Sequence, residues 1–212
     1  MPIVGFLHTS VVHEVTFEVL VAEIDDRADV VSVVDAALLD RARASGPNDP
    51  AVRADVRRHL VELADAGCER IICTCSTIGG AAEDVGRELG RIVMRVDRPM
   101  AEVAVALGGP ILVLATLEST LAPTLDLITS VASASGAELE VCALVVEGAW
   151  ARLEEGDLDA SLALVVDAIE RIGDEVGVIV LAQASMAAAA TVADADIPVL
   201  TSPRLAVERL LT

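Results

Sequence analysis

The sequence predicts an α/β fold in which two similar, Rossmann-like lobes with mostly parallel sheets face one cleft. Short apolar runs alternate with amphipathic segments along the 212 residues, which is the pattern of strands and helices in a parallel sheet. Two of these runs recur. Ile3–Leu7 is similar to Ile111–Ala115, which lies 108 positions later, and the run before Cys75 is similar to the run before Ala184, 109 positions later. The repetition indicates two equivalent halves.

The elements of the first half follow from hydrophobic runs and helix-start signals. We expect strands at Ile3–Leu7, Asp29–Val34, Arg70–Thr74 and Ile92–Arg95, and helices near 13–24, 50–66 and 78–89. Asn48-Asp49-Pro50 is a clear helix start, because an acidic residue can cap the helix and proline fits its first turn.

The second half shows the same order of elements. We expect strands at 110–115, 138–144, 176–181 and 198–200, and helices near 118–133, 157–172, 185–193 and 203–211. The predicted division is one lobe of residues 1–96 and a second of 97–202, with the last helix, 203–212, able to pack back on the first lobe. No low-complexity linker separates them.

Composition excludes several classes of function. The net charge of −19 argues against a nucleic-acid partner, whose phosphates require clustered cations. All 15 basic residues are arginine, so Schiff-base, pyridoxal phosphate and P-loop lysine chemistry are excluded. No apolar run reaches the roughly 18 to 20 residues of a membrane span, and we expect a cytoplasmic protein that does not bind membranes.

Cys75 is the main candidate for a reactive group. It lies at a predicted strand end just before a helix, where free N–H groups and the positive end of the helix dipole favour a thiolate. Cys73 and Cys75 alternate across the strand end and point to opposite faces, so we expect no metal site. Cys68, Cys73 and Cys142 lie in apolar or helical runs and are expected to be buried and inert.

Several segments together resemble the aspartate/glutamate/hydantoin racemase family, which is related to arylmalonate decarboxylase and maleate isomerase. They are Leu7-His8-Thr9-Ser10, Cys73 to Gly80, Asp97 to Ala101, Leu114-Ala115-Thr116 with Ser119-Thr120, Gly148-Ala149-Trp150, Leu181 to Ala187, and Ser202-Pro203-Arg204. The resemblance spans nearly the whole chain. It implies an enzyme that uses no cofactor, acts on a small carboxylate and forms a homodimer or larger homo-oligomer.

The resemblance also implies the roles of individual residues. Cys75 matches the first of two catalytic cysteines, whereas Ala184 occupies the second position and cannot transfer a proton. Ser76 and Thr77 would hold the substrate carboxylate, an arrangement that a helix N-terminus also favours. The other implied binding residues are Ser10, Thr116, Ser119, Thr120, Gln183 and Ser185, the last of which is also a candidate helix cap.

Other groups are candidates for the missing acid or base. His8 and Glu118 follow predicted strands, although a loop residue and a first-turn helix residue are the simpler interpretations. His13 and His59 lie in helical segments and are expected to be solvated. Arg98 could bind a carboxylate, but a structural pair with Asp97 or Glu102 is preferred.

Three functions remain open. The first is an enzyme that uses Cys75 alone for proton transfer, decarboxylation or isomerisation at the α carbon of a small carboxylic acid. The second is a true amino-acid or hydantoin racemase with a second base other than cysteine. The third is a carboxylate-binding protein without turnover.

Overall fold

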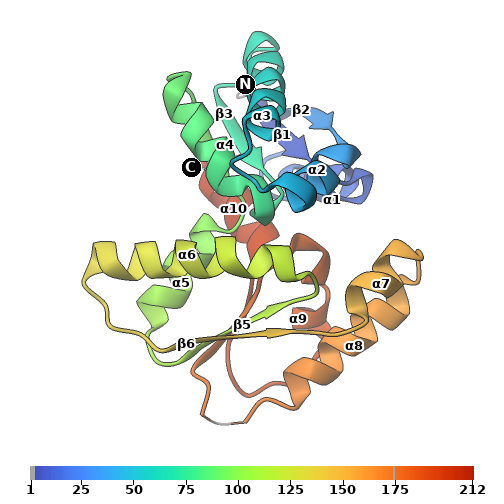
Figure 1. The fold of residues 1–212 in the computed structure, drawn as a ribbon, viewed down its shortest axis with the longest axis vertical. Coiled ribbons are helices and arrows are strands. Elements are labelled where there is room, and N and C mark those ends of the chain that lie inside the picture. The colour runs from blue at the N-terminus through green and yellow to red at the C-terminus, as the bar shows by residue number, and fades with distance from the viewer. Residues whose placement is uncertain (1–2, 174) are drawn as a thin grey trace. The chain divides into compact units, whose positions relative to one another are not determined.

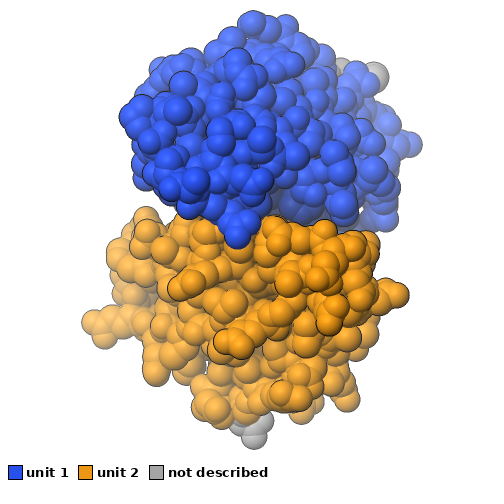
Figure 2. Space-filling model, turned by 45° about the vertical axis from the view of Figure 1, so that its right-hand side comes forward, with its two compact units in different colours: residues 1–98, 203–212 blue, residues 99–202 orange. Residues whose placement is uncertain are grey.

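The structure is a computed structural model that describes residues 3–173 and 175–212 (Figure 1). The chain divides into two compact units, coloured separately in Figure 2. Unit 1 contains residues 1–98 and 203–212, and unit 2 contains residues 99–202. Each unit is built around one four-stranded parallel sheet.

Unit 1 begins with strand β1, which lies at the centre of its sheet. The strands are β1 (Ile3–His8), β2 (Asp29–Val34), β3 (Arg70–Cys73) and β4 (Ile92–Arg95), in the order β2-β1-β3-β4. The helices are α1 (Val11–Ile24), α2 (Ala36–Ser45), α3 (Pro50–Asp65), α4 (Ser76–Glu88) and α10 (Ser202–Leu211). Helix α10 returns to this unit from the far end of the sequence, where Arg70 Nη1 donates to the carbonyl of Leu210 at 2.8 Å.

The side chains of β1 alternate between two faces, as strand geometry requires. Leu7 packs in a cluster with Ile71 and with buried residues of α2, α3 and α4. Phe6 and His8 point to the opposite face, where their rings contact Phe17 of α1. Both faces of the sheet are therefore covered, which explains why its central strands read as nearly continuous apolar runs.

Unit 2 repeats this topology. Its strands are β5 (Ile111–Ala115), β6 (Val141–Val145), β7 (Val178–Leu181) and β8 (Val199–Thr201), in the order β6-β5-β7-β8. Its helices are α5 (Arg98–Leu107), α6 (Glu118–Ser135), α7 (Ala149–Glu154), α8 (Leu158–Glu170) and α9 (Ala189–Val192), with a 3₁₀ turn at Ala184–Met186. Leu112, Leu114, Ile179 and Leu181 pack in a cluster with residues of α7, α8 and α9. In Figure 1, α6 and α8 are drawn beyond opposite sides of the β5–β6 ribbon.

The predicted α/β class is confirmed, and the predicted strands are all present within the described residues. Three helices were not predicted: α2, α5 and α7. Of these, α2 buries little apolar surface and α7 has six residues, so neither carries a long hydrophobic period. The helix expected near 185–193 is instead the 3₁₀ turn followed by the four-residue α9.

Helix α4 approaches β4 closely because two glycines face the strand. A Cβ on Gly86 would lie 2.5 Å from Cγ2 of Val93, and a Cβ on Gly79 would lie 2.7 Å from Cβ of Arg95. Positions seven apart on a helix share one face. Gly80 points elsewhere, because the nearest atom to its added Cβ would be Arg95 Nη1 at an ordinary 3.7 Å.

Alanine substitutions at Gly86, which faces β4, and at Gly80, which does not, should therefore change the stability in opposite directions. We expect Gly86→Ala to lower the free energy of unfolding by about 1–3 kcal/mol, because β-branched Val93 cannot move away from the new methyl group. The matched control, Gly80→Ala, should raise it by about 0.5–1 kcal/mol through helix propensity. Urea unfolding measures both values. Equal shifts in the two variants would contradict the close packing of α4 on β4.

Candidate active site

The carboxyl ends of β1 and β3 meet at one edge of the first sheet. The two strands are parallel neighbours, with Leu7 aligned with Cys73. The pairing continues beyond the strands, because the Thr74 N–H donates to the Leu7 carbonyl at 3.0 Å. The segment Thr74-Cys75 therefore lies beside the His8–Ser10 segment that follows β1.

Cys75 is the N-cap residue of α4. Its backbone is extended, its side chain makes no capping hydrogen bond, and it is only 7% exposed. Ser76 and Thr77, in the first turn of α4, are also buried. The thiol and these two hydroxyl residues thus lie where the unpaired N–H groups of a helix N-terminus can receive an anion.

Cys73 is an inert neighbour of this segment. Its side chain is fully buried, and its thiol donates a weak hydrogen bond to the Cys75 carbonyl, with Sγ 3.7 Å from the oxygen. Burial is the main cause that raises the pKa of Cys73, and the nearby Cys75 adds to the effect. Cys73 therefore stays a neutral thiol and braces the backbone of Cys75. Cys68 is buried as well, so the predicted burial of both cysteines is confirmed.

His8 is buried between β2 and the Thr74 segment. Its Nδ1 lies 2.9 Å from Thr74 Oγ1, and its Nε2 lies 3.3 Å from Ser32 Oγ. The Thr74 hydroxyl donates its proton to the Leu7 carbonyl at 3.2 Å, so it accepts from His8. The ring is therefore protonated at Nδ1, and its Nε2 accepts from Ser32. Both ring nitrogens hold structural bonds in this arrangement.

The residues expected to bind substrate in unit 2 gather at the ends of β5 and β7. Gln183 Oε1 accepts from the Thr116 N–H at 2.7 Å, and Gln183 Nε2 donates to Thr116 Oγ1 at 2.8 Å. Thr120, four residues after Thr116, is also buried. The buried Ser119 Oγ has no hydrogen-bond partner among the described residues. These groups form an uncharged, polar strand end.

Three further sequence-predicted positions in unit 2 differ in exposure. Ala184 is buried at the start of the 3₁₀ turn, while Ser185 is exposed. Ser185 lies inside the turn, whose N-cap residue is Gln183, so it is not the helix cap that its position after β7 suggested. Glu118 is an exposed first residue of α6, the position that the helix dipole favours for an acid.

Two arginines near α4 are held by acids. Arg98 donates to Glu83 through Nε at 2.6 Å and Nη2 at 2.5 Å, so the structural pairing is present with a partner that sequence reasoning did not name. Asp97 instead accepts from Arg95, through Nε at 2.6 Å and Nη2 at 2.8 Å. Sequence reasoning missed Arg95, although arginine at the end of a short strand, two residues before an acid, was a usable signal.

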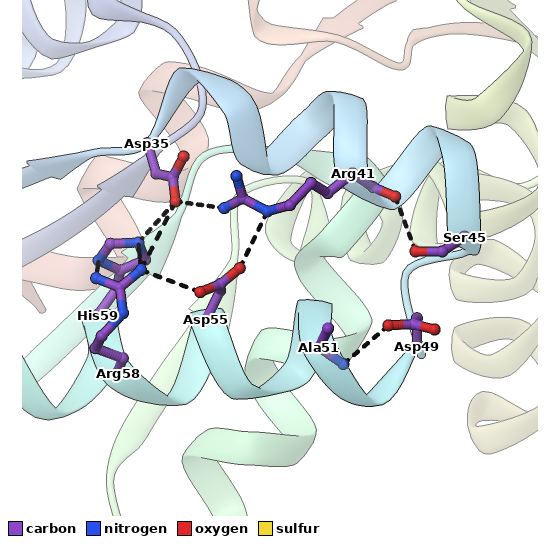
Figure 3. A network of polar contacts seen from close by, with 8 residues as sticks. All are labelled: Asp35, Arg41, Ser45, Asp49, Ala51, Asp55, Arg58 and His59. Carbon is purple, nitrogen blue, oxygen red and sulfur yellow. Dashed lines mark hydrogen bonds and ion pairs between the residues drawn. The ribbon is translucent and has the colours of Figure 1, made fainter.

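The expectation that His59 is solvated was wrong. It is buried on α3, and its Nε2 lies 3.0 Å from Asp35 Oδ2, which also accepts from Arg41 at 2.7 Å (Figure 3). Burial raises the pKa of Asp35, but hydrogen bonds from His59 and Arg41 outweigh it and leave this pKa lowered. The network joins the end of β2 to α2 and α3 and lies within the scaffold.

Two other expectations need correction. His13 is only partly exposed, because its Nδ1 is buried without a hydrogen-bond partner in the described structure and its ring meets Phe17 edge-on. Cys142 is exposed, because it lies on β6, an edge strand whose middle residues are uncovered. An edge strand can be hydrophobic in sequence without being buried.

Two other features are absent from the described part of the chain. No group of three or more His, Cys, Asp or Glu side chains among residues 3–173 and 175–212 is arranged to hold a metal ion. Across the same residues, no helix has the length and apolar character needed to cross a bilayer.

Comparison with known proteins places the chain in a family. The model of the family described as Asp/Glu/hydantoin racemase matches residues 9–210, which is nearly the whole sequence. The chain belongs to the Asp/Glu/hydantoin racemase family. No curated protein sequence matches it significantly.

Solved structures of racemases share the fold. Aspartate racemase from Picrophilus torridus superposes with a TM-score of 0.72 at 19% identity, covering 100% of this chain and 93% of that one. Glutamate racemase from Thermus thermophilus in complex with β-chloro-D-alanine gives 0.69 at 19% identity, covering 99% and 79%. Allantoin racemase from Klebsiella pneumoniae gives 0.65 at 18% identity, covering 100% and 86%. At these identities the likeness establishes the architecture and leaves the substrate open.

The buried His8 makes the stability of this family member depend on pH. Burial lowers the pKa of His8 from 6.5 to about 4, with a smaller effect of His13. Between these values the unfolded chain binds more protons than the folded one, so the contribution of His8 is complete above pH 6.5 and is lost as pH falls toward 4. We expect a slope of up to about 1.4 kcal/mol per pH unit from this group.

A His8→Asn variant isolates that contribution from those of carboxylates. Urea unfolding of both proteins at pH 7, 6, 5 and 4 should give a shallower loss of stability for the variant, because asparagine does not titrate. Parallel curves for wild type and variant would show that His8 is not held neutral by the fold.

Proposed function

We propose that this racemase-family protein is an enzyme that acts on a small carboxylic acid through the single thiol of Cys75. The observation that carries the proposal is the position of Cys75 as the N-cap of α4, beside the buried Ser76 and Thr77. The residue that the sequence repeat aligns with Cys75 is Ala184, and the N-cap residue after β7 is its neighbour Gln183, so neither position carries a thiol. Ser76 and Thr77 would hold the carboxylate, and Ser10, Thr116, Ser119, Thr120, Gln183 and Ser185 would contact its other polar groups.

One thiol is enough for a reaction that needs one proton delivery. In the decarboxylation of a substituted malonate, the bond from the α carbon to one carboxyl group breaks and carbon dioxide leaves. The electron pair of that bond delocalises into the remaining carboxylate and forms an enediolate. The Cys75 thiol then gives its proton to the α carbon and regains one from water. In an isomerisation, the thiolate adds to a double bond, rotation follows, and the thiolate leaves.

Racemisation through another second base is the alternative within the same family. His8 has both ring nitrogens in hydrogen bonds with Thr74 and Ser32, so taking up this role would require breaking one of them. Glu118 is exposed at the start of α6 and makes the weaker candidate. A carboxylate-binding protein without turnover is the third interpretation. Homo-oligomerisation, a cytoplasmic location and the use of no cofactor stay predictions.

Exchange in heavy water separates the three interpretations. We expect the protein, incubated with a panel of amino acids, hydantoins and substituted malonates in D₂O, to introduce one deuterium at the α carbon of one configuration only, because a single thiol serves one face. Mass spectrometry and chiral chromatography read the products, and Cys75→Ala should abolish incorporation. Deuterium in both configurations would identify a two-base racemase. A ligand that protects Cys75 yet returns unchanged would identify a binder.

Ala184→Cys should restore the second proton donor. We expect this variant to create or increase racemisation of substrates that wild type exchanges on one face, because the sequence repeat aligns position 184 with Cys75. The matched control is Ala182→Cys, where the buried side chain lies two positions earlier and should add no activity. Absence of any gain across the panel would count against equivalent roles for positions 75 and 184.

A further inference from the structure

A buried ion pair lies beside the first turns of α4. Arg95 and Asp97 meet through two parallel hydrogen bonds of 2.6 and 2.8 Å, with side chains 6% and 0% exposed. Removing two charged groups from water is energetically unfavourable, and replacing a buried ion pair by apolar residues is often neutral or stabilising. Stability alone is therefore a weak explanation for its presence.

The pair reaches the segment that carries the candidate thiol. Besides Asp97, Arg95 Nη2 donates to the Ser76 carbonyl at 3.4 Å, one residue from Cys75. Gly79 makes this contact possible, since a Cβ there would lie 2.7 Å from Cβ and 3.3 Å from Nε of Arg95. A second bond fixes the same helix about two turns later, where Glu83 accepts from the Arg95 N–H at 3.2 Å.

Arg95 and the neighbouring Arg98 are each paired with an acid, which limits the attraction of this region for an anion. Asp97 neutralises the guanidinium, and Glu83 faces the neighbouring Arg98, so the surroundings offer little net attraction to an anion. The contribution of Arg95 is therefore its geometry. Its planar guanidinium donates two hydrogen bonds to Asp97 and a further one to the Ser76 carbonyl. A lysine ammonium has the charge but not this fixed fork.

We propose that Arg95, held in place by Asp97, is a positioning residue that orients the Cys75-Ser76-Thr77 turn for a bound carboxylate. This inference rests on the proposed function, because it assigns Arg95 a part in the same site. Arg95 acts through the Ser76 carbonyl and needs no contact with substrate. The first-turn N–H groups of α4 then keep one direction relative to the Cys75 thiol.

Two alkylating reagents of similar size test this orientation. Iodoacetate carries a carboxylate and iodoacetamide does not, so the ratio of their rates at Cys75 reports how well the turn receives a carboxylate beside the thiol. The exposed Cys142 supplies the reference ratio in the same sample, and the buried Cys68 labels only when unit 1 opens. Peptide mass spectrometry measures each cysteine separately.

We expect the iodoacetate-to-iodoacetamide ratio at Cys75 to exceed that at Cys142 in wild type. It should fall by about tenfold in Arg95→Met and Arg95→Lys, the loss expected for one hydrogen bond to a charged group, and also fall in Asp97→Asn. Labelling of Cys68 should stay slow throughout. The matched control is Arg171→Met, which removes an exposed arginine paired with Asp167 and should leave every rate unchanged.

Several outcomes would overturn the positioning role. They are an unchanged ratio at Cys75, a parallel rise of labelling at Cys68 and Cys75, loss of folded protein in all three variants, or a wild-type ratio at Cys75 no higher than at Cys142. The proposed function can fail separately. If Cys75 supports no exchange or turnover but its ratio still depends on Arg95, the positioning stands and the enzyme reading falls. If turnover needs Cys75 but the labelling ratio does not depend on Arg95, the proposed function stands and the positioning role of Arg95 is wrong.

Discussion

The parallel pairing of β1 with β3 is the constraint on which the candidate site depends. It aligns Leu7 with Cys73 and continues as the bond from the Thr74 N–H to the Leu7 carbonyl. That bond brings Thr74 to His8, and the following residue, Cys75, becomes the N-cap of α4. A slip of one residue in this register would reverse the faces of every side chain on β3 and shift Thr74 and Cys75 relative to His8.

Around this edge the fold keeps ionisable side chains neutral or paired. His8 is held in its neutral form by burial, Cys73 is a neutral thiol, and Arg95 is balanced by Asp97. Uncompensated charge in such a place would be costly, because the surroundings cannot solvate it. In the proposed site the oriented backbone N–H groups of α4 would hold the carboxylate, and they add no titratable group that could compete with the thiol for a proton.

The sequence predicted the strands because each is a buried apolar run bounded by turns, and it predicted α3 because Asp49 and Pro50 mark its start. It placed Cys75 at a helix start for the same local reason. Local patterns do not identify partners that come from distant elements. The helical pattern around His59 predicted a solvated side chain, because it does not reveal that Asp35, 24 residues away, lies within hydrogen-bonding distance. Cys142 looked buried because its run is apolar, whereas its place at a sheet edge depends on strand order.

Under the proposed function, the methyl side chain of Ala184 restricts the possible reactions more than membership of the family does. The two positions follow equivalent strands, β3 and β7, in sheets of the same order. Removing a proton from one face of a carbon and returning it to the other requires two groups, and a methyl side chain can serve as neither. The described surroundings of Ala184 offer hydroxyl and amide groups from Thr116 and Gln183, which are already bonded to each other. The proposed single-thiol enzyme would therefore catalyse reactions in which a proton arrives on one face only.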